Sequence, residues 1–219
     1  MNDLFQLSRL AGNGGSPVEL LIALFLLGLV PVLAVSVTSF TRIVVVLGLL
    51  RSSIGAPSLP PNAVIVALAV MLTGAVMSPT FARMNNEAVR PYLDHRLTPG
   101  QALERGAKPL HTFMLRQVRP AEISAFSRIA RVRPTTPQRV PFFVLAPAFL
   151  VGELRTAFAM GFALALPFAV IDVVVASVLM SLGMFMVSPV SIALPIKLLL
   201  FVVADGWALI ASALVASYR

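Results

Sequence analysis

The chain has 219 residues, of which 58% are hydrophobic and only 12% are charged, and its mean hydropathy is +0.92. This balance lies far outside the range of soluble globular domains and is typical of a membrane protein. The absence of cysteine excludes structural disulfides, thiol-ligated metals and cysteine nucleophiles. The net charge of +8 could suit nucleic acid, but the basic residues are spread without aromatic stacking partners or a binding motif, so we expect no nucleic-acid partner.

The chain begins with a polar N-terminal lead, residues 1–16, followed by an apolar block from Pro17 to Thr38. The block is long enough to cross about 30 Å of hydrocarbon. It is uncharged except for Glu19 at its entrance, and Pro31 is placed to kink it. A secretory signal peptide would have a shorter apolar core, and Arg9 is the only cation ahead of this one. We therefore expect a retained membrane anchor.

A short apolar run and a second long one come next. In the segment TSFTRIVVVLGLLR, Thr38 to Arg51, two arginines bracket a run too short to span a bilayer. The helix-breaking segment GAPSLPPN follows from Gly55 to Asn62, and Ala63 to Ala82 is again uncharged and of spanning length. We predict a short helix, a tight reversal and a second span, so that residues 17–82 form a first helical hairpin.

Residues 83–139 are different in character, with eleven Lys or Arg against four Asp or Glu. Within this polar domain, Ala102 to Gln117 and Pro120 to Ala130 each place apolar residues at helical spacing, which predicts two short amphipathic helices. His95 and His111 are isolated from each other and lack a partner at ligand spacing. We therefore expect surface histidines and no metal site.

The last 80 residues, 140–219, contain two apolar blocks around a methionine-rich turn. The blocks run from Val140 to Leu182 and from Ser191 to Ser217, and the turn is GMFMVSP, Gly183 to Pro189. We predict a second helical hairpin. The fold class expected for the whole chain is thus an all-α membrane-type protein with two long helical hairpins and a small helical polar domain between them.

Five charges lie inside the apolar blocks of the second hairpin. Placing a charged side chain in hydrocarbon costs free energy, so charges inside apolar blocks usually mark a functional site. We expect these charges to be buried and paired, as assembly contacts within or between subunits. Lys197 could pair with Asp172, Asp205 or Glu153, and Lys197 and Asp205 are eight positions apart, roughly 80° on a continuous helix. An alternative for Glu153 and Arg155 is a position near a helix end at the headgroup level. The five charges are Glu153, Arg155, Asp172, Lys197 and Asp205.

The methionine-rich turn is a candidate pore gate. Methionine is flexible, so Met184 and Met186 around Phe185 could close a narrow pore and still deform around a variable cargo. The alternative is ordinary packing against lipid or neighbouring helices. The breakers Gly183, Pro189 and Pro195 favour the gate, because irregular backbone at membrane depth is tolerated only inside protein or beside a water-filled cavity.

Several long segments of the chain match one known family in order: TSFTRIVVVLGLLR, PPN at Pro60 to Asn62, FMLRQ at Phe113 to Gln117, ELRTAF at Glu153 to Phe158, and ALPIKLLLFVVADGW at Ala193 to Trp207. The resemblance runs from about residue 18 to 217 and is to the FliP family of flagellar type III export-gate proteins. The injectisome relatives called SctR are also similar, and SPVSIALPIK is closer to them, whereas ALERGAKPLHTFMLRQ resembles the flagellar branch, which we favour.

The resemblance implies an assembly. Several copies, a pentamer in the family, would combine with FliQ-like and FliR-like subunits into a helical pore complex at the centre of the flagellar basal body. FlhA and FlhB would be further partners in the export apparatus, and unfolded export substrates would pass through the pore. It implies also a multi-pass protein of the bacterial inner membrane.

The resemblance also implies a methionine gasket that falls on Met184, Phe185 and Met186. The family commonly has three successive methionines there, and the bulkier, stiffer phenylalanine predicts a less compliant seal. Many flagellar members begin with a cleavable signal peptide, which this sequence does not show. The family places the polar domain in the periplasm, whereas the positive-inside rule would keep so basic a loop in the cytoplasm; we expect the periplasmic arrangement.

Two other classes of function remain to be weighed. In a small ion or solute transporter, Asp172, Lys197 and Asp205 would form a proton or ion relay instead of assembly contacts, and neutralising Asp172 would distinguish the two roles. A membrane enzyme would need chemistry that is absent, since the chain has no HExxH, no glycine-rich phosphate loop and no paired nucleophile and base. We expect no catalytic activity, no cofactor and no bound metal.

Overall fold

The structure, a computed structural model, describes residues 17–56 and 58–218, and within these ranges every regular element is helical. The chain divides into two compact units, Met1–Ser36 and Val37–Arg219. The first unit contains nearly all of helix α2 (Pro17–Val37), which confirms a helix where the first apolar block predicts one, with Pro31 inside it. The polar lead predicted over residues 1–16 lies outside the described residues.

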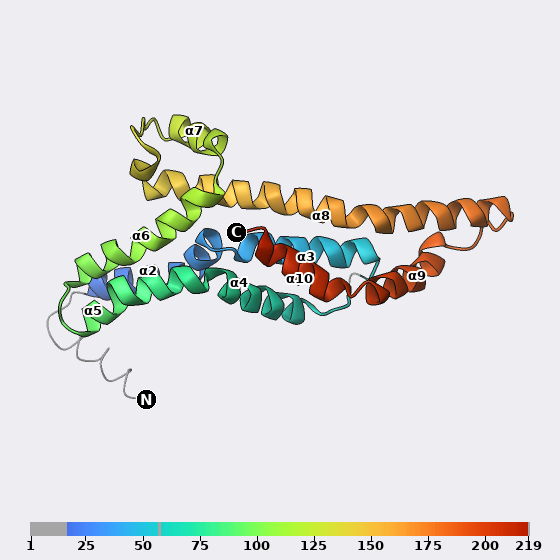
Figure 1. The fold of residues 1–219 in the computed structure, drawn as a ribbon, viewed down its shortest axis with the longest axis horizontal. Helices are drawn as coiled ribbons and strands as arrows, with labels where there is room; N and C mark the ends of the chain where they lie inside the picture. The colour runs from blue at the N-terminus through green and yellow to red at the C-terminus, as the bar shows by residue number, and fades with distance from the viewer. Residues whose placement is uncertain (1–16, 57, 219) are drawn as a thin grey trace. The chain divides into compact units, whose positions relative to one another are not determined.

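The second unit is a set of helices of very different lengths (Figure 1). The short helix, the reversal and the two amphipathic helices expected from the sequence are all present. In chain order the elements are α3 (Phe40–Ile54), α4 (Asn62–Met84), the π-helix η1 (Asn85–Val89), α5 (Arg90–Leu93), α6 (Pro99–Gln117), α7 (Pro120–Ile129), the 3-10 turn η2 (Pro137–Arg139), α8 (Phe142–Ser181), α9 (Pro189–Val203) and α10 (Gly206–Ala216).

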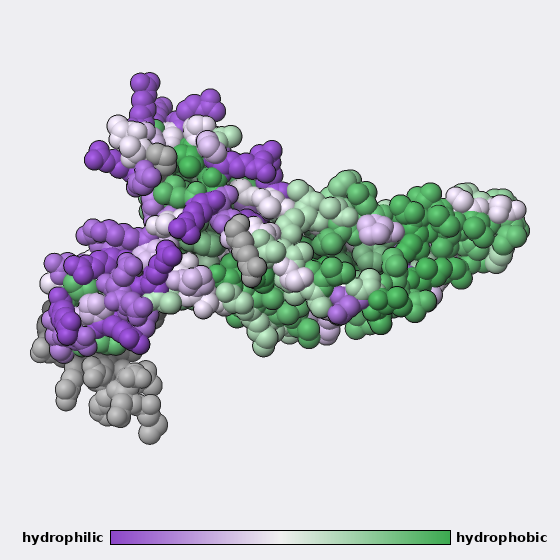
Figure 2. All heavy atoms as spheres, in the orientation of Figure 1, coloured by the Kyte–Doolittle hydropathy of each residue, from purple (hydrophilic) through white to green (hydrophobic). Residues whose placement is uncertain are grey.

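Helix α8 is the longest element of the unit. Its 40 residues extend for about 60 Å at 1.5 Å per residue, roughly twice the hydrocarbon thickness of a bilayer. It remains one helix although Pro147 and Pro167 lie inside it. Helix α3 packs along it, α4 packs on α3, and α9 returns beside its C-terminal part. The surface over this part of α8 and over α9 is almost entirely hydrophobic (Figure 2).

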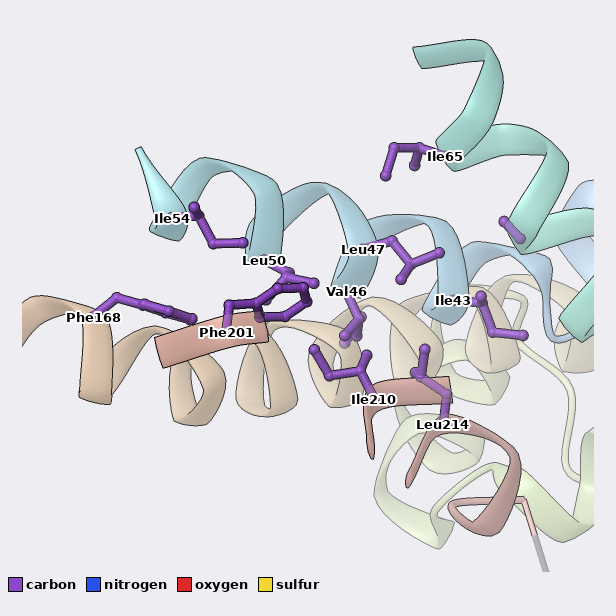
Figure 3. Packing of buried hydrophobic residues seen from close by; sticks show 12 residues of the cluster. Ile43, Val46, Leu47, Leu50, Ile54, Ile65, Phe168, Phe201, Ile210 and Leu214 are labelled. Atoms are coloured by element: carbon purple, nitrogen blue, oxygen red, sulfur yellow. The ribbon is translucent and has the colours of Figure 1, made fainter. Parts of the chain in front are cut away.

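The main core lies where α3 meets α8 and the last two helices (Figure 3). From Ile43 to Ile54 the buried residues of α3 are apolar and recur at helical spacing, which gives this part of the short helix an apolar face. The opposite walls come from α4, α8, α9 and α10. The cluster consists of Ile43, Val46, Leu47, Leu50, Ile54, Ile65, Ala69, Ala157, Phe168, Phe201, Ile210 and Leu214.

The polar segment packs onto the first turns of α8. A capping box begins α6, with the Thr98 hydroxyl accepting from the Gln101 amide and the Gln101 side chain accepting from the Thr98 amide. Helices α6 and α7 bury their apolar faces against Phe149 and its neighbours on α8. Hydrophilic residues cover the outside of α6 and α7 (Figure 2). The two amphipathic helices are therefore confirmed, with Pro120 as the first residue of the second.

Among the described residues, two helical stretches are long and apolar enough to cross a membrane. One is the continuous run of α4, η1 and α5, Asn62–Leu93, and the other is α8, Phe142–Ser181. The number rises to four if each of two bent helix pairs is one span. One of these bent pairs shows that the block Ser191–Ser217, expected from the sequence to be one helix, is two. Helices α9 and α10 meet at an angle of 64°, and Asp205 between them has a left-handed backbone conformation at φ 48°. The angular relation of Lys197 to Asp205, worked out for a continuous helix, is therefore wrong.

Candidate functional site

The connection between α8 and α9 is an exposed apolar turn. Helix α8 ends in a Schellman motif, in which the Gly183 amide donates to the Met180 carbonyl and the Met184 amide to that of Leu179. The motif requires a left-handed residue, and Gly183 supplies it at φ 72°. Beyond it the chain turns back over a small cluster of α8 and α9 residues. The turn is thus held in place by its ends.

The three residues predicted as a pore gate form the tip of this turn. Met184 is half-exposed, Phe185 is 80% exposed and Met186 is fully exposed. Large apolar side chains so exposed at one place usually mark a contact surface. The single chain therefore presents, at the end of a long hairpin, an apolar tip that none of its described residues covers.

A buried ion pair joins α3 to α8. The Arg42 guanidinium donates from Nε to Glu153 Oε2 at 3.0 Å and from Nη2 to Oε1 at 2.5 Å, so the pair is bidentate. Both side chains are almost completely buried, Glu153 being 1% exposed. Arg42 Nη1 also donates to the carbonyl and hydroxyl oxygens of Ser217. Glu153 is therefore a buried, paired charge inside one chain.

Tyr218 covers this ion pair from the far end of the sequence. Its ring lies 3.8 Å below the Arg42 guanidinium and stacks on Phe113 of α6. Its hydroxyl bonds the Glu153 carboxylate and lies 3.2 Å from the Ser39 carbonyl oxygen. Burial raises the pKa of the Tyr218 phenol, so the hydroxyl stays protonated and remains a donor. Neither Arg42 nor Tyr218 was predicted from the sequence as a partner of Glu153.

Lys197 pairs with only one of the three acids that the sequence offers as partners, Asp172. Its Nζ lies 2.6 Å from Asp172 Oδ2 and also donates to the Ser53 carbonyl oxygen at 3.2 Å. The two partners differ in burial, because the Lys197 side chain is 5% exposed and that of Asp172 is 45% exposed. The pair therefore ties α9 to α8 and α3, with one side of the carboxylate facing outward.

The remaining two predicted charges lie elsewhere. Arg155 contacts Glu122 of α7 at 3.2 Å and is 61% exposed, and Asp205 is exposed at the break between α9 and α10. The structure thus brings Asp172 and Lys197 together, gives Glu153 and Arg155 other partners, and leaves Asp205 on the surface of the single chain.

Histidine positions agree only in part with the sequence analysis. His95 is exposed, whereas His111 is half-buried with Nε2 2.8 Å from the Val140 carbonyl oxygen, so the expected surface position is wrong for His111. In the part of the chain that the structure describes, no three His, Cys, Asp or Glu side chains gather as metal ligands would.

Comparison with known proteins identifies the relatives of this chain. The model described as the FliP family matches residues 23–214. The flagellar biosynthetic protein FliP of Pectobacterium carotovorum subsp. carotovorum is 46% identical over 211 residues, which cover 94% of this chain and 82% of the relative. The protein of that name from Bacillus subtilis (strain 168) is 42% identical over 207 residues, covering 94% of each chain. That of Aquifex aeolicus (strain VF5) is 44% identical over 211 residues, covering 95% of this chain and 88% of the relative.

Proposed function

Because the chain belongs to the FliP family of flagellar biosynthetic proteins, we propose that it is the pore-forming subunit of a gate that passes unfolded flagellar proteins across the bacterial inner membrane. The observation that carries the proposal is the exposed tip of the α8–α9 hairpin. A tip with Phe185 and Met186 in water would be unfavourable, so something must cover it.

Copies of the chain arranged around one axis would bring these tips together. Met184 and Met186 would then form a ring of unbranched, deformable side chains, which can close a narrow passage and yield to segments of different shape. Phe185 stands between them and has only two rotatable side-chain bonds, so the ring would yield less than one made of methionine alone.

The rest of the hairpin supports an assembly over a single lipid-embedded chain. Helix α8 is about twice as long as the hydrocarbon layer is thick, so lipid alone cannot surround it. Two charges exposed on the single chain, Arg155 and Asp205, would be expensive against lipid tails. We place them at contacts with neighbouring copies or with FliQ-like and FliR-like subunits, in a homo-oligomer that the family suggests is a pentamer and that FlhA and FlhB would join in the basal body.

Native mass spectrometry of the detergent-extracted full chain, alone and with candidate FliQ and FliR partners, tests this proposal. We expect a discrete homo-oligomer that gains both partners. An Asp205→Lys variant should lose the higher species, whereas Asp94→Lys, a charge reversal at an exposed residue of the polar segment, should keep them. A monomer or dimer that is indifferent to the partners would contradict the proposal.

A further inference from the structure

An open groove crosses the polar segment between α6, α7 and the chain that leads into α8. Its volume is about 1150 Å³. Pockets for small molecules are generally about 300–1,000 Å³, so this groove has room for a piece of polypeptide. Its floor is apolar and consists mainly of Leu115, Val118, Ile123, Val132, Val140 and Phe142.

The rim of the groove is strongly basic. Lys108 and Arg116 border it from α6, Arg128 from α7 and Arg133 from the loop that follows. Glu104 is the one carboxylate among the lining residues, and it is already bound to Lys108 at 3.3 Å. For the three arginines, no ion pair within the described ranges 17–56 and 58–218 offsets the charge.

The wall of the groove also holds a polar atom without a partner. Ser127 is only 6% exposed, and its hydroxyl has no hydrogen-bond partner among the described residues. A buried hydroxyl without a partner costs free energy, so this wall of the groove is not fully satisfied in the single chain.

The spacing of the cations distinguishes between anionic ligands. Lys108 and Arg116 are eight residues apart on α6, which places them about 12 Å apart along the helix axis. The pair of Lys108 with Glu104 is exposed and therefore weak, so a ligand can compete for this cation. A single phosphate cannot reach both, whereas carboxylates about two helical turns apart on one helix can. Arg128 and Arg133 add cations from the facing side.

We propose that the groove binds an acidic amphipathic helix of a partner protein, whose apolar face covers the floor and whose carboxylates meet the arginines. None of the helices described within residues 17–56 and 58–218 carries a cluster of acids that would make it such a helix. Residues 1–16 contain one acid and one base, and the exposed acids Glu87 and Asp94 alternate with arginines in the sequence. The inference does not depend on the pore, because it rests on the polar segment alone.

The test uses the full chain in nanodiscs of neutral phosphatidylcholine, with empty nanodiscs as the blank. The probe is a fluorescent peptide of about 18 residues, long enough to be helical, with leucines on one face and glutamates on its flanks. A scrambled peptide of equal composition and a peptide with lysine for glutamate are the controls. Binding is followed by fluorescence anisotropy at two salt concentrations, because an electrostatic contact weakens as salt rises.

We expect the acidic peptide to bind at least about tenfold more tightly than either control and to lose about tenfold in affinity with the double variant Arg116→Glu, Arg128→Glu. Arg105→Glu, on the same helix but outside the groove lining, should change affinity less than about twofold. The pair Arg128→Glu, Arg133→Glu repeats the test on other residues if the first pair does not fold.

Two results would overturn the proposal. One is equal binding of the acidic and scrambled peptides, or an equal loss of affinity with Arg105→Glu. The other is failure of the peptide to bind while vesicles that contain phosphatidylglycerol bind the chain through Arg116 and Arg128, which would make the groove a contact for lipid headgroups.

Discussion

Arg42 and Glu153 are opposite charges that meet where almost no solvent reaches. Removing both charges from water is costly, and the bidentate contact, together with the bonds that Arg42 donates to Ser217 and that Tyr218 donates to Glu153, offsets that cost. Such a pair is therefore sensitive to the loss of either partner, because the remaining charge would stay buried without compensation.

Glu153→Ala should lower the free energy of unfolding by about 3–5 kcal/mol, because it leaves the Arg42 guanidinium buried and unpaired. Thermal unfolding of the purified chain in detergent measures the effect. Glu104→Ala is the matched control: its partner Lys108 lies one turn away on an exposed helix face, and its loss should cost less than about 0.5 kcal/mol. Equal shifts in the two variants would show that the buried pair contributes nothing special.

The Lys197–Asp172 pair should respond asymmetrically, because the two partners differ in burial. Asp172→Asn leaves a buried ammonium without its counter-charge and should cost about 2 kcal/mol or more, whereas Lys197→Met leaves a half-exposed carboxylate that water can solvate and should cost about half as much. Unfolding midpoints of both variants show which of the two substitutions costs more stability.

Native mass spectrometry and an ion-flux assay on Asp172→Asn distinguish an assembly contact from a transport relay. A variant of a relay would lose flux and keep the oligomer intact, whereas a variant of an assembly contact would lose the oligomer.

For single residues, the sequence allowed some partners of the buried charges to be predicted but not others. Lys197 needed an acid, and the three acids on its own hairpin could be named, because charges inside apolar blocks are few. Arg42 looked like one of two arginines that bracket a short apolar run, and nothing local reveals that its partner is Glu153. Tyr218 gave no signal at all, because a tyrosine near a helix end is ordinary at a membrane interface.

Helices α3 and α8 approach closely at one glycine. A Cβ atom added to Gly161 would lie 2.9 Å from Leu49 Cβ, a contact that cannot be relieved by rotating a side chain. The close approach explains why Gly161 is tolerated in the middle of a long helix despite its low helix propensity.

Gly161→Ala should destabilise the chain by about 1–3 kcal/mol, because α3 and α8 must separate to make room for the methyl group. Gly152→Ala is the control in the same helix: no atom lies within 4 Å of its added Cβ, and the better helix propensity of alanine should stabilise it by up to about 1 kcal/mol. Opposite shifts of the unfolding midpoint are expected. Destabilisation of both to the same degree would argue against a specific contact at Gly161.

The α8–α9 turn can be tested as a seal. Replacing Met184, Phe185 and Met186 together by alanine removes most of the apolar volume at the tip without touching the Gly183 motif, so we expect small ions to leak through the assembled complex. Conductance of the complex in planar bilayers measures the leak. Val190→Ala, an exposed residue of α9 beyond the turn, should leave conductance at the background level. Closed channels in both variants would rule out the gate.

Element boundaries were predictable where composition changes abruptly. The glycine and proline pairs around residues 55–62 and 183–189 locate both reversals, and α8 follows from its apolar length despite two prolines. The break between α9 and α10 was missed because the apolar run continues across it. An Asp–Gly pair at Asp205 and Gly206 was the available turn signal. The one-turn π-helix after Met84 leaves no mark in the sequence that we can identify.

For the whole molecule, the sequence gives conflicting indications of topology, and one experiment decides between them. The family implies a periplasmic polar domain, whereas its excess of basic residues would keep an ordinary loop in the cytoplasm. Alkaline phosphatase inserted at Glu104, an exposed residue of α6, should be active, because this reporter folds only outside the cytoplasm. Green fluorescent protein inserted at the same site should stay dark. The reverse pattern would mean a cytoplasmic domain.

The Arg42–Glu153 pair also limits when the core can form during synthesis of the chain. The two residues are 111 positions apart in the chain, and at about 5–20 residues per second a ribosome needs roughly 5 to 20 s to make the intervening segment. Throughout that interval the first apolar helix of the unit carries a bare guanidinium, which hydrocarbon would reject. In the membrane protein proposed above, helix α3 would therefore have to stay at the membrane surface or within the insertion machinery until α8 has been synthesised, and the order of translation would set the earliest moment at which the core can close.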